Sequence, residues 1–265
     1  MNHSNLNVLL KELRLSGFAR HHDEVALRAE RQGWSFGQYL LHLAQTEVDE
    51  RRVRRVERFL KESRLPKDKS MATLDVGRFE PSVQKAVGRL QQGHWVHGAE
   101  NLLVFGLPGV GKTHLVAALG LELIHAGFRV RFFPTFKLVQ ALLLAKKELR
   151  LEKLLAQLDR FDVVILDDLG YVQQERDEME VLFTFLAERY ERRSIMITSN
   201  LVFSQWEKIF KDPMTAAAAI DRLVHHSSIL ELNGPSFRHQ AAKERSQKLQ
   251  EGDDTSSPIT SNREI

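Results

Sequence analysis

The chain has 265 residues, of which 43% are hydrophobic and 28% charged, and its formal net charge is +3. These values are typical of a soluble globular protein, and no apolar run is long enough to span a bilayer, so we expect no membrane association. Cysteine is absent, which excludes disulfides, thiol catalysis and thiolate metal sites. Lys11 and Glu12 interrupt the apolar stretch that a signal peptide would need, so we expect a cytoplasmic protein.

Residues 1–70 are predicted to form a small all-helical domain. Apolar residues recur at helical spacing over residues 36–60, with Ser35 suited to cap the helix and Pro66 to stop it. Residues 51–69 hold nine Lys or Arg against three acidic residues, a net charge of +6. Two interpretations stay open for this segment, a solvated helix face and a surface that contacts nucleic acid.

Residues 71–240 alternate between strand and helix patterns. Strands are predicted at 101–106, 128–133, 161–168, 194–200 and 227–232, and helices at 113–127, 178–193 and 216–226. Residues 137–158 form either one long helix or a pair. This alternation predicts an α/β fold with a parallel sheet covered on both faces. The polar tail, residues 241–265, begins helix-like and is expected to be disordered.

The loop after the first predicted strand, GLPGVGKT, matches the phosphate-binding pattern G-x-x-x-x-G-K-[ST] at Gly106, Gly111, Lys112 and Thr113. The glycines allow backbone N–H groups to surround phosphates at a helix N-terminus, whose dipole favours anions. Lys112 is expected to reach the β and γ phosphates, and the Thr113 hydroxyl to ligate Mg²⁺. The sequence therefore predicts a site for ATP and Mg²⁺.

Polar residues follow two further predicted strands. VVILDD ends in Asp167, expected to hold Mg²⁺, and in Asp168, expected to orient or polarise an attacking water. SIMITSN ends in Asn200, which is a candidate sensor of the γ-phosphate or simply part of a turn. Arg222 lies on a predicted helix and is an ordinary surface residue unless it reaches a neighbouring subunit's ATP site.

Five blocks of sequence together resemble the IstB-like ATPases, which are ATP-binding helpers of insertion-sequence transposases and AAA+ proteins related to the DnaC helicase loader. The blocks are ENLLVFGLPGVGKTHLV, VVILDDLGY, LFTFLAERYERRSIMITSNLVFSQW, AIDRLVHHSSILEL and GPSFR. The resemblance implies a P-loop AAA+ domain over residues 71–240. Leu107 replaces a usual Pro, Phe237 replaces a usual Tyr, and Asp168 replaces the Glu of many AAA+ proteins. The shorter side chain of Asp168 is expected to place the water differently and to slow hydrolysis.

The resemblance also implies roles for individual residues. Asn200 matches the sensor-1 position, Arg222 matches the arginine that completes a neighbouring subunit's site, and Arg238 matches an arginine that acts on nucleotide or on the oligomer contact. The expected catalytic residues are Asp168, Asn200 and Arg222. The expected nucleotide-binding residues are Gly106, Pro108, Gly109, Val110, Gly111, Lys112, Thr113, His114 and Arg238. Adenine contacts are expected from the segment just before residue 101.

The function implied by the resemblance is an ATPase that forms a homo-oligomer on double-stranded DNA, bends the duplex and recruits a partner transposase. Basic residues in the region after the second strand suit phosphate contacts, although a solvated helix face remains an alternative for Lys137, Lys146, Lys147, Arg150 and Lys153. A replicative helicase loader is the closest rival function. A small-molecule kinase and an ATP-binding scaffold that barely hydrolyses ATP are further alternatives.

Overall fold

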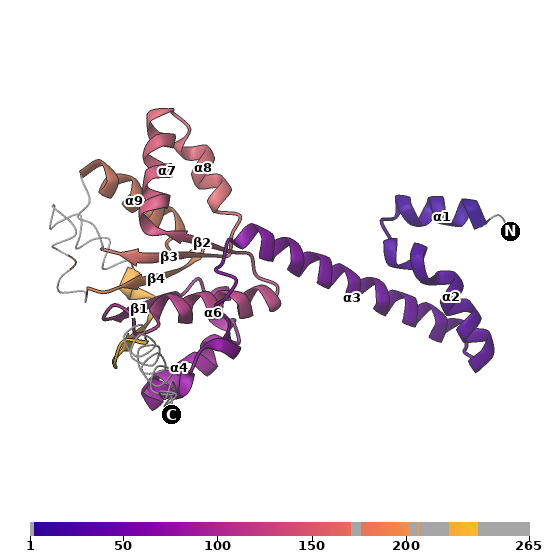
Figure 1. The fold of residues 1–265 in the computed structure, drawn as a ribbon. Helices are drawn as coiled ribbons and strands as arrows, with labels where there is room; N and C mark the ends of the chain where they lie inside the picture. Colours follow the sequence, from indigo (N-terminus) through magenta and orange to yellow (C-terminus); the bar gives the residue numbers. More distant parts are fainter. Residues whose placement is uncertain (1–2, 171–175, 202–205, 207–222, 238–265) are drawn as a thin grey trace, which may run out of the picture. The chain divides into compact units, whose positions relative to one another are not determined.

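A computed structural model describes residues 3–170, 176–201, 206 and 223–237, and Figure 1 shows their fold. The chain divides into two units, residues 1–62 and residues 63–265. The sequence placed this division at residues 70 and 71, beyond the end of the last helix of the first unit. Within the described residues, no helix is both long and apolar enough to cross a membrane.

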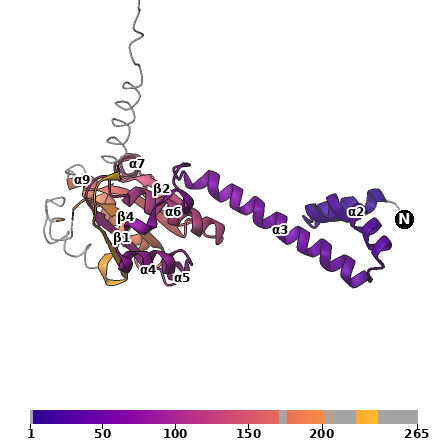
Figure 2. The same ribbon diagram turned by 60° about the horizontal axis from the view of Figure 1, so that its bottom comes forward.

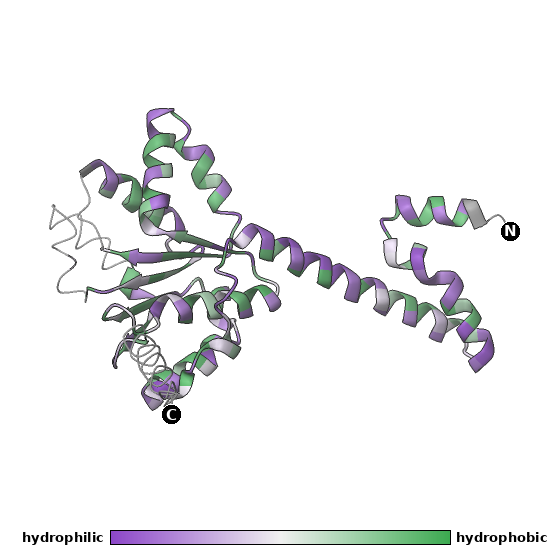
Figure 3. Ribbon diagram, viewed as in Figure 1, coloured by the Kyte–Doolittle hydropathy of each residue, from purple (hydrophilic) through white to green (hydrophobic). Residues whose placement is uncertain are grey.

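The first unit is built from three helices, α1 (His3–Glu12), α2 (Ser16–Gln32) and α3 (Phe36–Ser63). The predicted cap of α3 is present, because the Gln38 backbone N–H donates to Ser35 Oγ at 3.3 Å and the Ser35 N–H donates to Gln38 Oε1 at 2.7 Å. Hydrophilic residues dominate the second half of α3 (Figure 3). This half carries the basic segment that the sequence singled out.

A buried carboxylate joins α2 to α3. Glu47 accepts hydrogen bonds from the Gly17 N–H and from Arg51 Nε, the latter at 2.6 Å. Burial alone would raise the pKa of Glu47, but the hydrogen bonds from Arg51 and Gly17 outweigh it and lower the pKa. Glu47 therefore stays ionised and partly balances the arginines around it.

The second unit is organised on a five-stranded parallel sheet in the order β2-β3-β4-β1-β5. The strands are β1 (Asn101–Gly106), β2 (Val130–Pro134), β3 (Val163–Leu169), β4 (Ser194–Ser199) and β5 (Ser227–Leu232). The predicted parallel α/β fold is confirmed. The strands β2, β3 and β4 all lie on one side of β1, and β5 lies on its other side. This reversal of the strand order opens a crevice at the carboxyl ends of the strands.

Helices cover both faces of this sheet. One face carries α7 (Thr135–Lys147), α8 (Leu151–Leu158) and α9 (Arg176–Arg189), so residues 137–158 form a pair of helices rather than one. The other face carries α6 (Lys112–His125), with α4 (Pro81–Leu90) and α5 (His94–His97) on the same side, away from α7 (Figure 2). The 3₁₀ turns η1 (Met71–Thr73) and η2 (Val76–Arg78) precede α4.

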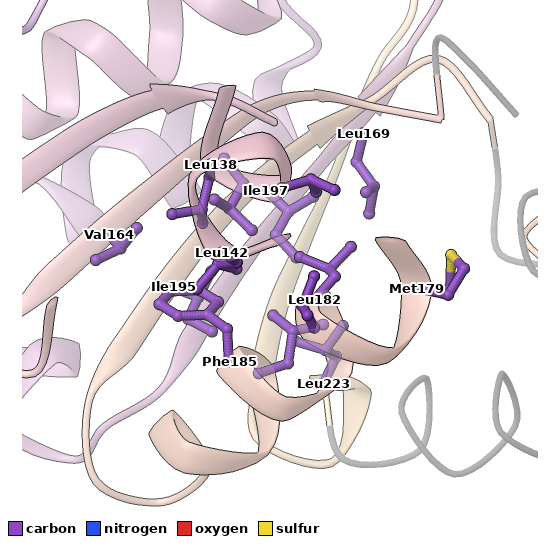
Figure 4. Close-up of a cluster of buried hydrophobic side chains, with 14 of the residues drawn as sticks. Leu138, Leu142, Val164, Leu169, Met179, Leu182, Phe185, Ile195, Ile197 and Leu223 are labelled. Carbon is purple, nitrogen blue, oxygen red and sulfur yellow. The ribbon is translucent and has the colours of Figure 1, made fainter. Parts of the chain in front are cut away.

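Buried apolar side chains fix these helices to the sheet. Leu142 of α7 and Leu182 and Phe185 of α9 pack against Ile195 and Ile197 of β4 (Figure 4). These five side chains are at most 2% exposed. The close packing holds the carboxyl ends of β1, β3 and β4 in fixed positions, which is where the candidate site lies.

Candidate nucleotide-binding site

The glycine-rich loop connects the end of β1 to the start of α6. Gly106, Gly109 and Gly111 have φ values of 149°, 86° and 100°, a region that side chains disfavour. A Cβ on Gly109 would lie 2.1 Å from Ser236 Oγ, so the Ser236 hydroxyl would have to move to admit a side chain here. Gly111 is the N-cap of α6, so the loop delivers the N-terminal end of a 14-residue helix to the site.

Lys112 lies inside this loop. Its side chain is buried, and Nζ donates to Gly106 O at 2.6 Å and to Leu107 O at 3.0 Å. Two carbonyl oxygens thus hold the ammonium group beside the backbone N–H groups of the loop. This arrangement concentrates positive charge where the phosphates of a nucleotide would lie.

Thr113 and Asp167 meet across the space between the loop and β3. Thr113 Oγ1 lies 2.9 Å from Asp167 Oδ1 and 3.1 Å from Oδ2. Burial raises the pKa of Asp167 and outweighs the hydrogen bonds from Thr198 and Thr113 that favour its charged form. A hydroxyl and a carboxylate are both hard oxygen donors, so this pair fits Mg²⁺.

A β-bulge positions the two aspartates. The pairing of β3 with β4 passes from Leu166↔Ile197 to Leu169↔Ser199, so Asp167 and Asp168 together face Thr198. Asp168 has φ of 60° and is exposed, whereas Asp167 is buried. In a regular strand, two successive side chains would lie on opposite faces of the sheet. The bulge instead leaves Asp167 buried and Asp168 exposed at the end of the strand.

Thr198 holds this bulge together. Its Oγ1 donates to Asp167 Oδ1 at 2.7 Å and accepts from the Asp168 N–H at 2.8 Å. The threonine is fully buried. The sequence analysis singled out Asn200 at this strand end and missed Thr198, because the pairing of β3 with β4 is not visible in either strand alone.

A cavity of about 420 Å³ brings these elements together. Pro108, Gly109, Gly111, Lys112, Thr113 and His114 line it from the loop and α6, and Asp168 and Asn200 line it from the strand ends. Segment 69–78 and Phe237 form the other wall, through Lys69, Thr73, Leu74, Asp75, Arg78 and Phe237. The volume lies within the usual range for small-molecule sites.

Adenine contacts were expected from the segment just before residue 101, and this stays a prediction. The residues between 79 and 100 do not line the cavity, whereas segment 69–78 does. Arg78 stacks over the Phe237 ring, with Cζ 4.2 Å from the ring centroid, and the Phe237 N–H donates to Gly109 O at 2.9 Å. The 3₁₀ turns of segment 69–78 bring residues far from the loop in sequence back beside it.

Several expected site residues occupy other positions. Val110 is 3% exposed and does not line the cavity. Gly106 does not line the cavity either, but its carbonyl oxygen accepts a hydrogen bond from Lys112 Nζ. His114 lines the cavity, but its Nε2 lies 3.1 Å from both Thr73 Oγ1 and Ser70 O, so it also ties α6 to segment 69–78. Arg222 and Arg238 lie outside the described residues.

The sequence model of the IstB-like ATP binding proteins matches residues 8–246. The chain belongs to this family. Among similar proteins, an insertion sequence ATP-binding protein of Sinorhizobium fredii is 46% identical over 90% of this chain and 80% of its own length. The insertion sequence IS21 ATP-binding protein of Pseudomonas aeruginosa is 39% identical over 88% of each chain.

Solved structures of other proteins have a similar fold. The crystal structure of DnaI has a TM-score of 0.55 and 20% identity over 64% of this chain and 96% of its own. AMPPCP-bound DnaA from Aquifex aeolicus has a TM-score of 0.54 and 19% identity over 71% of this chain and 57% of its own. This IstB-like protein therefore has the P-loop AAA+ fold, and its glycine loop lies at the site where such folds present a helix N-terminus to phosphate.

Proposed function

We propose that this IstB-like protein is an ATPase that assembles with ATP on double-stranded DNA and serves a partner transposase. The observation that carries the proposal is the contact of Thr113 with the buried Asp167 beside the glycine loop, in a chain that belongs to a family of ATP binding proteins. The names of the similar proteins link them to insertion sequences, which supports a role in transposition.

Different residues of the site bind the phosphates, the cation and the rest of MgATP. The loop N–H groups and Lys112 bind the β and γ phosphates, and Thr113 and Asp167 hold the cation. Mg²⁺ supplies charge neutralisation of the phosphates when it is bound. Segment 69–78 and Phe237 enclose the remaining part of the nucleotide, because they form the wall of the cavity opposite the loop.

Hydrolysis requires a water molecule placed in line with the γ-phosphate. Asp168 offers an exposed carboxylate at the cavity to orient and polarise that water, and Asn200 offers an amide on the neighbouring strand end. We assign Arg222 to the site of an adjacent subunit, where its charge stabilises the transferring phosphoryl group. Arg222→Ala is expected to retain nucleotide binding and to lose hydrolysis, measured as phosphate release.

A basic hollow in the first unit suits the phosphates of DNA. Arg51, Arg54, Arg55 and Arg58 follow one another at i, i+3, i+4 and i+7 on α3, and with Arg14 they line a hollow of about 610 Å³. This spacing places four guanidinium groups along one helix face over roughly 10 Å. Arg51 and Arg54 share the buried Glu47, so the hollow keeps an excess of positive charge.

Sedimentation of the full chain with a roughly 50-base-pair duplex at two salt concentrations tests the proposal. The duplex is combined with ATP, with ADP or with no nucleotide. We expect a large complex that needs both ATP and duplex and that weakens at the higher salt. Lys112→Ala is expected to abolish the ATP-dependent complex while the far-UV circular dichroism stays unchanged.

Two results would contradict the proposal. A protein that stays monomeric with ATP and duplex would remove the DNA-bound assembly and favour a small-molecule enzyme. Preferential assembly on single strands would favour a helicase loader. Co-sedimentation with a transposase of an IS21-type insertion sequence then tests the partner, and failure of that step alone would leave the ATP-dependent DNA assembly in place.

A further inference from the structure

The turn between α7 and α8 carries a leucine in an unfavourable backbone conformation. The Leu149 N–H donates to Lys146 O at 3.1 Å and the Arg150 N–H donates to Ala145 O at 2.7 Å, which is the hydrogen-bond pattern of a Schellman motif. Leu149 occupies the position of this motif that glycine usually takes, with φ of 55°. A side chain there is disfavoured because Cβ crowds the backbone.

The leucine gains no packing in return. Its side chain is 96% exposed, and the residue that normally makes the apolar contact of this motif is Arg150. Five other non-glycine residues in the described part of the chain have positive φ; four of them are charged and the fifth, Ala99, is buried. Among these six, Leu149 alone combines a large apolar side chain with exposure.

Cations surround this leucine. Residues 146–153 contain Lys146, Lys147, Arg150 and Lys153 against Glu148 and Glu152, a net charge of +2 from four basic and two acidic residues. Lys146 pairs with Glu180 at 2.7 Å and Arg150 with Glu148 at 3.6 Å, both on the surface, where such pairs exchange readily for other partners. Figure 1 shows the turn at the end of the α7–α8 hairpin that lies farthest from the sheet.

An exposed leucine among lysines and arginines fits nucleic acid better than a protein partner. Protein interfaces are depleted in lysine at their centre, whereas cations beside an apolar tip match a duplex, which offers phosphates at its edge and stacked bases inside. Proteins that kink DNA insert leucine and similar side chains between base pairs from the minor groove. The short reach of a tight turn suits this insertion.

We propose that Leu149 is a wedge that enters between two base pairs of the duplex and kinks it, while the cations of residues 146–153 contact the flanking phosphates. The inference rests on the proposed function, because it requires that the protein binds double-stranded DNA. It adds the residue that distorts the duplex. It also explains why an exposed turn keeps a leucine where glycine would be more stable.

The test compares the full-length protein with Leu149→Gly, using a duplex that carries a fluorescence donor and acceptor at its ends. With ATP, the wild-type protein is expected to raise energy transfer as the duplex bends. Leu149→Gly is expected to lose more than about half of that rise while its affinity changes by less than about threefold, because phosphate contacts dominate binding. The melting temperature of this variant is expected to rise by about 2–4 °C, because glycine relieves the backbone.

Two further variants serve as controls. Leu144→Ala removes another exposed leucine of α7, 58% exposed, and is expected to bend the duplex as the wild type does. Leu149→Met restores an apolar wedge and is expected to restore bending. Together they separate insertion at the turn from a general loss of apolar surface on the hairpin.

The possible failures are distinguishable. If Leu149→Gly binds and bends the duplex as the wild type does, the wedge is refuted and the DNA-bound assembly stands. If the variant instead binds the duplex but no longer forms the large ATP-dependent complex on it, Leu149 is a protein contact and the wedge is likewise refuted. If the wild-type protein does not bind duplex with ATP, the proposed function fails and the wedge with it.

Discussion

Thr198 supports the candidate site through two hydrogen bonds, and Thr198→Val removes both while keeping the shape of the side chain. The hydroxyl donates to Asp167 Oδ1 at 2.7 Å and accepts from the Asp168 N–H at 2.8 Å. Valine leaves a part-buried N–H without its acceptor and a buried carboxylate without one of its donors. The β-bulge that separates the two aspartates should therefore be the part of the protein that is affected.

The expected magnitudes follow from these contacts. An unsatisfied buried group costs about 1–3 kcal/mol, so we expect the free energy of unfolding to fall by about 2 kcal/mol. The hydrogen bond from Thr198 opposes the rise that burial causes in the pKa of Asp167, so without it that pKa rises further. A larger neutral fraction of Asp167 weakens the grip on Mg²⁺, and a loss of about 1.4 kcal/mol lowers the affinity for MgATP about tenfold.

Denaturant unfolding measures the first effect, and titration with a fluorescent ATP analogue, with and without Mg²⁺, measures the second. The affinity lost by Thr198→Val should recover as the pH rises, because the carboxylate ionises again. Thr198→Ser restores the hydroxyl and serves as the matched rescue. Ser199→Ala removes the neighbouring buried hydroxyl, which bonds Leu169 O and not the carboxylate. An ATP affinity of Thr198→Val that depends on Mg²⁺ as the wild type's does, at every pH tested, would refute this account.

Three more predictions concern residues of the second unit. Because burial raises the pKa of Asp167 above its ordinary 3.8, the native state keeps a proton that the unfolded chain has lost, and stability falls as pH rises through that interval. Asp167→Asn should remove this loss, raise the free energy of unfolding at pH values above that interval and abolish the Mg²⁺ dependence of ATP binding; unfolding curves at several pH values decide whether it does. Gly109→Ala should lower ATP affinity more than about tenfold, since its Cβ would lie 2.1 Å from Ser236 Oγ. Gly127 also has a positive φ, 100°, but open space around it, so Gly127→Ala should change ATP affinity little. Arg189→Met should cost about 3 kcal/mol of stability because the buried guanidinium donates to four backbone carbonyl oxygens, and a cost as small as that of the exposed Arg192→Met would contradict this reasoning.

The sheet could be predicted from sequence because its strands are continuous apolar runs, as parallel strands buried on both faces must be. The glycine loop was recognisable because its chemistry depends on residues that are adjacent in sequence. The break between α7 and α8 was left open, since residues 137–158 have helical spacing throughout. The structure has a turn at Leu149, which has a positive φ. The sequence carries no glycine or proline there that would have predicted the end of a helix.

The rest of the candidate site depends on contacts between distant segments. Thr198 is one of several buried residues of an apolar strand, and its role appears only when Asp167 and Asp168 bulge opposite it. Arg78 lies far before the loop, and the 3₁₀ turns bring it to the cavity. Glu47 has the sequence context of a surface residue, yet it is 3% exposed because α2 begins against it. The periodicity of apolar residues predicts one helix or strand at a time and cannot predict contacts between residues of different elements.

α7 connects two of the places where a non-glycine residue has a positive φ, Asp168 and Leu149. Its first residue, Thr135, is buried and donates to the backbone carbonyl of Asp167 at 2.9 Å, and its last, Lys147, precedes the turn that holds Leu149. A helix of 13 residues spans about 20 Å, so α7 links the bulge at one end directly to the turn at the other. If Leu149 binds DNA more tightly in one position of α7, thermodynamic linkage requires that DNA changes nucleotide affinity by the same factor. The strained backbone at Asp168 and at Leu149 would then belong to one mechanism, in which each site biases the same rigid helix.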